Sequence, residues 1–154
     1  MDVDLLVNPN IVAGTATLET VDIPTLDFND LIAIGNGGQK TLFNLPAGSG
    51  VLACIVNETV AVTGTSSLVI DVGTTGADPD EFIDALDVDA MSGPVANTGD
   101  LFVQSAGTTT IAGGALPVKL VATETPVLLE VTDSSIASAT AGEITISFLV
   151  LDFS

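Results

Sequence analysis

The 154-residue chain carries 20 acidic and two basic residues, which gives a formal net charge of −18. Such a surface repels phosphate groups, so the composition argues against binding to nucleic acid or to an anionic membrane. The length suits a single domain, residues 1–154. Its core must be largely aliphatic, because only 4% of the residues are aromatic and Trp and Tyr are absent.

The first segment, residues 1–28, contains apolar residues without a sustained period and is interrupted by Pro9, Gly14 and Pro24. We expect an extended N-terminal arm that is buried against another subunit; a meander along the edge of a sheet fits the pattern equally well. The acidic start of the chain lacks the basic residues of a signal peptide, so we expect no secretion signal. The candidate interface residues in the arm are Leu5, Leu6, Val7, Ile11 and Val12.

Two hairpins are predicted in the next part of the chain. The glycine-rich turn at residues 35–38 separates an expected strand at 31–34 from another at 39–45. A long apolar run, residues 51–63, and the run at 68–72 are joined by a short Gly/Thr/Ser link, which is typical of a second, central hairpin. Cys54 lies within that long run, and we expect a buried, unreactive thiol.

A helix start follows the central hairpin. Asp78 can cap a helix, Pro79 suits its first position and Glu81 can reach back as in a capping box, so the pattern predicts a short helix at residues 79–86. Acidic residues are dense between Asp78 and Asp89. Their oxygens suit Ca²⁺, but no EF-hand pattern is present, and a capped helix followed by a polar loop explains them better.

The last third of the chain consists of short apolar runs between Gly, Pro, Ser and Asp residues. The final run alternates cleanly and its second face also becomes apolar, which predicts a strand at the centre of its sheet. About nine or ten short strands favour an all-β fold, a β-sandwich with a jelly-roll-like topology. After an expected loop at 87–98, the predicted strands are 101–104, 108–111, 118–123, 127–132 and 143–152.

Residues that carry chemistry are scarce. The chain has no histidine, which removes the commonest general base and the commonest transition-metal ligand. Paired carboxylates of the glycosidase type remain possible by residue type, but the aromatic rings that usually hold sugars are missing. We therefore predict a protein that is not an enzyme and has no cofactor.

Three segments follow one another along the chain: KTLFNLPAG (residues 40–48), DPDEFI (78–83) and TAGEITISFLVLDF (140–153), with a long Val-rich strand between the first two. Their order resembles that of small virion structural proteins of tailed bacteriophages. The resemblance covers about residues 39–153. The sequence departs from the pattern at Leu151-Asp152-Phe153, where Tyr is common in such proteins, and the N-terminal segment has no counterpart.

The resemblance implies a head decoration (cement) protein on the outer surface of the virion. Its partner would be the major capsid protein, and it would bridge neighbouring capsid subunits, as a trimer at their junctions. A head-fibre or tail component that binds the host surface is the alternative. The family implies no catalytic residues.

Overall fold

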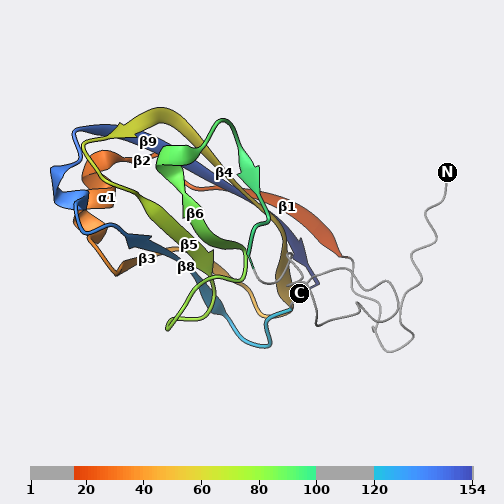
Figure 1. The fold of residues 1–154 in the computed structure, drawn as a ribbon. Helices are drawn as coiled ribbons and strands as arrows, with labels where there is room; N and C mark the ends of the chain where they lie inside the picture. The colour runs from red at the N-terminus through yellow and green to blue at the C-terminus, as the bar shows by residue number, and fades with distance from the viewer. Residues whose placement is uncertain (1–15, 100–119, 154) are drawn as a thin grey trace, which may run out of the picture.

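The computed structural model describes residues 16–99 and 120–153, which form two antiparallel sheets stacked face to face (Figure 1). The predicted all-β sandwich is confirmed. Sheet 1 has the order β1-β9-β4-β7, and β2 pairs with β9 on the same side as β1. Its strands are β1 (Thr17–Asp22), β2 (Leu26–Asp27), β4 (Ser49–Thr63), β7 (Val95–Ala96) and β9 (Ala141–Asp152).

Sheet 2 has the order β3-β8-β5-β6, and its strands are β3 (Gly38–Leu45), β5 (Val69–Gly73), β6 (Ile83–Asp87) and β8 (Thr125–Thr132). The pairings of the two sheets are nested along the chain. β5 pairs with β6, β4 with β7, β3 with β8, and β1 with β9. The chain therefore follows the path of one long hairpin that is folded over into two layers.

The strand β9 occupies the centre of sheet 1, as its alternating sequence predicts. It pairs with β4 on one side and with β1 and β2 on the other. Its inward side chains are nearly inaccessible to solvent, whereas the intervening ones are half-buried. The buried positions are Ile144, Ile146, Phe148 and Val150.

The core between the sheets is aliphatic apart from a small aromatic group. The ring of Phe148 packs edge-on against Phe43, with 4.9 Å between ring centroids, and against Phe82 at 6.4 Å. Such edge-to-face contacts are favourable beyond the area they bury. Cys54 is completely buried, as expected, and burial raises the pKa of its thiol well above the usual range, so the neutral form persists.

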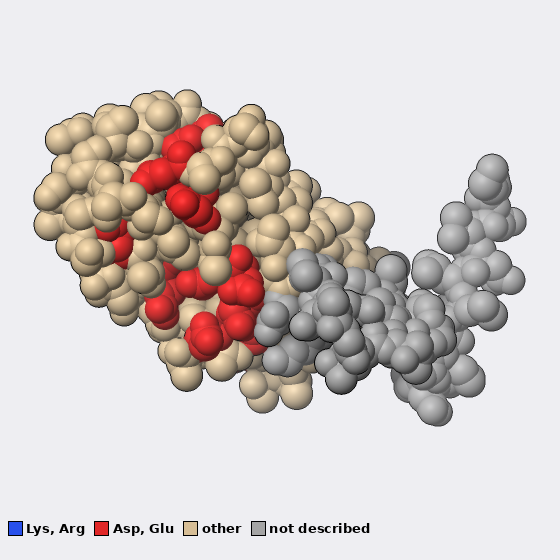
Figure 2. Space-filling view, viewed as in Figure 1, with Lys and Arg blue, Asp and Glu red and all other residues tan. Residues whose placement is uncertain are grey.

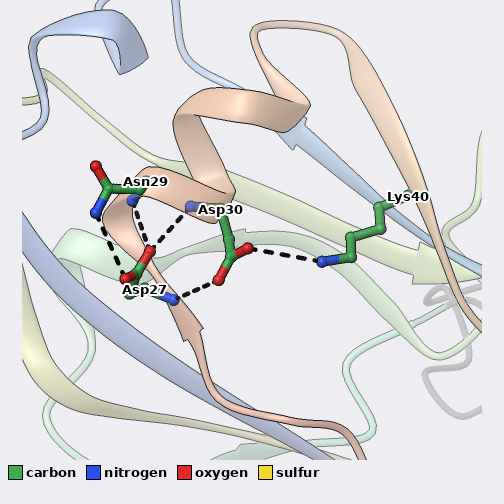
Figure 3. A network of polar contacts seen from close by, with 4 residues as sticks. All are labelled: Asp27, Asn29, Asp30 and Lys40. Atoms are coloured by element: carbon green, nitrogen blue, oxygen red, sulfur yellow. Dashed lines mark hydrogen bonds and ion pairs between the residues drawn. The ribbon is translucent and has the colours of Figure 1, made fainter.

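The described helix, α1, covers Phe28–Ile34, where the sequence predicted a strand at residues 31–34. Asp27 and Asp30 form a reciprocal capping box: Asp27 Oδ1 accepts from the backbone N–H of Asp30 (3.0 Å), and Asp30 Oδ2 accepts from that of Asp27 (3.2 Å) (Figure 3). The helix buries Leu31 completely. Its start was missed because Asp, rather than Glu or Gln, closes the box.

The helix predicted at residues 79–86 is wrong, because this segment leads into β6. Glu81 does not reach back to cap a helix start. Its carboxylate instead accepts hydrogen bonds from the backbone and hydroxyl of Thr74 (2.6 and 2.9 Å) and from those of Thr75 (3.3 and 2.6 Å). Phe82 and Ile83 are both buried, and β6 begins at Ile83.

The predicted central hairpin is also wrong, because β4 and β5 belong to different sheets. The link at residues 64–68 crosses from one layer to the other. Gly64 has φ +86°, and a Cβ there would lie 2.4 Å from the carbonyl oxygen of Ser138, so the crossing needs glycine. The predicted pairing of residues 31–34 with 39–45 fails for the reason given above, whereas the strand at 39–45 is confirmed as part of β3.

Other predicted segments have mixed outcomes. The strands at 127–132 and 143–152 are confirmed as β8 and β9. The expected loop at 87–98 contains a 3₁₀ turn, η1 (Val88–Ala90), and β7; a second 3₁₀ turn, η2 (Ile136–Ser138), precedes β9. The described part of the run at 118–123 forms no strand. The runs at 101–104 and 108–111 lie outside the described residues.

Asp133 joins three connections at one end of the sandwich. Its Oδ1 accepts from the backbone N–H and the hydroxyl of Ser135 (both 2.7 Å) and from the hydroxyl of Ser66 (3.3 Å), while its own N–H donates to Asn36 Oδ1 (2.9 Å). Burial opposes ionisation, but these bonds outweigh it and lower the pKa of Asp133. The ionised carboxylate therefore fixes the link between β4 and β5 to the link between β8 and β9.

Truncating Phe148 should be far more damaging than truncating its neighbour on the other face of β9. We expect Phe148→Ala to lower the free energy of unfolding by about 3–5 kcal/mol, because it leaves a cavity in contact with two other rings. Leu149→Ala, at a half-buried outward position, is the control and should cost clearly less. Urea unfolding measures both, and equal losses would contradict the assignment of the two faces.

The contribution of Asp133 should depend on pH. Its pKa is lower in the folded chain than in the unfolded one, so the stabilisation is complete above its ordinary value of 3.8 and is lost as the pH falls through the folded value. At pH 7 we expect Asp133→Asn to be less stable than wild type by about 1–2 kcal/mol. The difference should shrink below pH 3.8. Asp22→Asn, at an exposed position, is the control; a difference for Asp133→Asn that does not vary with pH would contradict this role.

Candidate interaction surfaces

The outer face of sheet 1 carries an apolar patch across three neighbouring strands. Paired residues of antiparallel strands point to the same side, and Leu18 of β1 is paired with Leu151 of β9, while Leu149 is paired with Ala53 of β4. Ile55 lies two residues further along β4 on the same side. These five residues, Leu18, Ala53, Ile55, Leu149 and Leu151, are called the apolar patch below.

The patch is accessible to solvent. Leu18 is 59% exposed and Ile55 is 43% exposed, and Val60, which is paired with Glu143 further along the same face, is 42% exposed. Among the described residues, Leu120 is the remaining large hydrophobic residue with a comparable exposure. Single exposed apolar residues are normal on protein surfaces, but exposed residues that share one sheet face are typical of an interaction surface.

Charge is sparse on this face. Within the described residues, the register of β1, β4 and β9 directs the carboxylates of Asp22 and Glu143 outward from it. Glu143 Oε2 accepts a hydrogen bond from the hydroxyl of Thr59 (3.4 Å). Other outward positions of these three strands are polar but neutral, among them Thr20, Asn57, Thr145 and Ser147. The face is therefore largely uncharged in a strongly acidic protein.

The opposite face, on sheet 2, is acidic. Gln39, Glu130 and Asp71 form one cross-strand row, and Gln39 Nε2 donates to Glu130 Oε2 (2.6 Å). Acidic side chains gather over the region of β5 and β6 in Figure 2, and no basic side chain of the described residues is visible there. The two layers of the sandwich thus present different chemistry to solvent.

Burial and the neighbouring carboxylates of this acidic face both affect the pKa of Asp71. Burial raises the pKa of Asp71, and the nearby charges of Asp84, Glu130 and Asp78 raise it further, against a hydrogen bond from the backbone of Ala85 (2.6 Å) that lowers it. The ionised carboxylates of this face therefore repel one another at neutral pH.

The segment 78–89 does not gather its carboxylates around one point. Glu81 bonds to Thr74 and Thr75, while Asp89 accepts from the hydroxyl of Thr65 (3.1 Å) and from the backbone of Leu68 (3.2 Å). In residues 16–99 and 120–153, no group of three or more His, Cys, Asp or Glu side chains is placed to hold a metal ion. Within those ranges no helix is long and apolar enough to cross a membrane.

A shallow depression of about 310 Å³ lies beside α1 and is lined by Asp30, Ala33, Ile34, Gln39 and Lys40. Lys40 Nζ lies 3.9 Å from Asp30 Oδ1, and both side chains are more than 40% exposed, so this ion pair contributes little to stability (Figure 3). The two charges in the depression already face each other. The depression therefore offers no unpaired group for a ligand.

The predicted interface residues Leu5, Leu6, Val7, Ile11 and Val12 lie outside the described residues, so their role stays a prediction. Residues 17–22 and 26–27 of the predicted arm form β1 and β2 at the edge of sheet 1. The apolar patch was not predicted from the sequence. The apolar second face of residues 149–151 was a signal for it, but its extent depends on which strands lie beside β9.

Comparison with known proteins supports the fold. No family model and no curated protein match the sequence. Among solved structures, a chain in "Cyanophage Pam1 capsid asymmetric unit" matches with a TM-score of 0.60 and 16% identity, over 96% of this chain and 92% of that chain. A chain in "Capsid of Ralstonia phage GP4" matches with a TM-score of 0.52 and 18% identity, over 93% of this chain and 88% of that one. Both matches are similarities of fold along nearly the whole chain.

Proposed function

We propose that this protein is a head decoration (cement) protein, which binds the outer surface of a tailed-phage capsid and stabilises the shell by bridging capsid subunits. The observation that carries the proposal is the match in fold, over 96% of this chain, to a chain in the cyanophage Pam1 capsid structure. The order of sequence segments in residues 39–153 points independently to the same class of protein. The partner is the major capsid protein, and the work is mechanical.

The character of the two sheet faces supports this function. A protein that bridges subunits needs a surface to bury against protein and another that stays hydrated at the exterior of the particle. The apolar patch on sheet 1 suits the first role, and the acidic face of sheet 2 suits the second. A catalytic role has less support, because the carboxylates near Asp71 lie on a sheet face and the chain has no histidine.

We also infer that the sandwich is a jelly roll. Eight of the described strands form the four nested pairs of a long hairpin: β1 with β9, β3 with β8, β4 with β7, and β5 with β6. Folding such a hairpin over itself gives two sheets in which early and late strands alternate, as in β1-β9-β4-β7 and β3-β8-β5-β6.

The assembled form would be a trimer at the junctions of capsid subunits, because closed rotational symmetry lets each copy use the same contact without fibre growth. The apolar residues of the N-terminal segment, Leu5, Leu6, Val7, Ile11 and Val12, would hold the trimer together or anchor it to the capsid. A short strand-forming segment can add to the edge of a sheet in another subunit through main-chain hydrogen bonds.

Antibody labelling of purified virions tests the function. We expect a gold-labelled antibody against this chain to cover the whole head surface and to leave the tail unlabelled. The same particles stripped of the protein should rupture at a lower temperature and regain their resistance when purified protein is added back. Label confined to the tail or to a few fibres would favour the alternative of a tail or head-fibre component and contradict the proposal.

Deleting residues 1–12 tests the role of the N-terminal segment. We expect the truncated protein to keep its β circular dichroism, since β1 begins at Thr17, but to lose its trimeric mass or to bind undecorated heads at least tenfold more weakly. Native mass spectrometry and co-sedimentation measure the two quantities. If the truncated protein keeps both its mass and its affinity, the segment is a passive tail.

A further inference from the structure

We infer that the protein docks on the capsid through the outer face of sheet 1, with the apolar patch against a weakly charged, apolar surface of the capsid protein. This inference rests on the proposed function and assigns that function to one face. The acidic face of sheet 2 then points away from the shell.

The patch has the composition that a buried contact needs. Leu18 and Ile55 project from two different strands, and the half-buried side chains of Leu149 and Leu151 fill the space between them on β9. The central part of a protein–protein interface is depleted of charge and enriched in apolar area, while its rim is polar. The neutral residues Thr20 and Asn57, together with Asp22 and Glu143, would supply such a rim.

Charge decides between the capsid and a second copy as the occupant. A second copy with its patch against this one would form a two-fold contact between two molecules of formal charge −18, which repulsion opposes and which does not build the proposed trimer. The capsid protein is a different chain, so its surface need not carry the same negative charge. Docking through sheet 2 is disfavoured for a related reason, because Asp71, Asp84 and Glu130 would have to lose water or find cationic partners.

The position of the chain start is consistent with this face. Residues 1–15 are joined covalently to β1, which forms one edge of sheet 1 and carries Leu18. The candidate interface residues 5–12 thus precede, by a few residues of sequence, the strand that carries Leu18.

The test compares two double variants that add the same charge to opposite faces. Leu18→Glu with Ile55→Glu changes the apolar patch, and Thr41→Glu with Thr132→Glu changes exposed outward positions on sheet 2. We expect the patch variant to bind undecorated heads at least tenfold more weakly, and the sheet 2 variant to stay within twofold of wild type. Wild-type affinity should change little with salt, since few charges would lie in the contact.

Circular dichroism and thermal melts establish that each variant is folded, and Leu18→Ser replaces the patch double variant if that variant is not folded.

Equal binding by both double variants, or a loss confined to the sheet 2 variant, would overturn the assignment of the face and leave the decoration function standing. If the patch variant kept its head affinity but changed its native mass, the face would be a contact between copies, and the assignment of the face would likewise be wrong. Failure of the wild-type protein to bind heads would instead refute the proposed function.

Discussion

The pairing of β9 with both of its neighbours is the constraint on which the rest of this sandwich depends. Its twelve residues contact β4 along one side and β1 and β2 along the other, and its side chains alternate between the core and the outer face of sheet 1. A slip of one residue would exchange these two sets. Gly142, with φ +145°, allows the close approach of β4, since a Cβ there would lie 2.8 Å from a methyl group of Val62. The same register therefore sets the core and the apolar patch.

Sequence patterns predicted the strands whose burial is decided locally. The alternation in residues 143–152, the apolar run in β8 and the strand that follows the glycine-rich turn at 35–38 are visible without knowledge of their partners, and so is the burial of Cys54. The helix was placed wrongly because two segments offer similar cap residues. Asp78-Pro79 has the better local signal, but Glu81 is engaged by Thr74 and Thr75, and Asp27 and Asp30 cap the real helix. At residues 79–86 the hydrogen bonds of Glu81 to the preceding turn replace the expected cap, whereas the cap of α1 is local and was missed because Asp closes it.

The apolar patch depends even more on such contacts. Leu149 and Leu151 are recognisable in the sequence as an apolar second face, and they correctly indicate a central strand. Their association with Leu18 and Ile55 follows from the pairing of β9 with β1 and β4, across about 95 to 130 residues of chain. The sequence instead indicated that β4 would pair with β5. With that pairing, the outward residues of β4 would have been grouped with Asp71 and its acidic neighbours, and the difference between the two faces would have been lost.

The cost of removing water is what distinguishes the two faces as contact surfaces. Burying an ionised carboxylate without a partner costs several kcal/mol, whereas burying an aliphatic side chain is favourable by about 25 cal/mol per Å² of apolar area. On sheet 2 burial raises the pKa of Asp71 and the neighbouring carboxylates raise it further, so a partner without cations would make the ionised form still less favourable. On sheet 1 the outward carboxylates of the described residues, Asp22, Asp27 and Glu143, do not belong to the apolar patch, so the patch can lose water while they keep their own contacts with solvent or with the start of α1. A protein with a charge of −18 can thus form an apolar contact on one face because its fold holds most of the described carboxylates elsewhere.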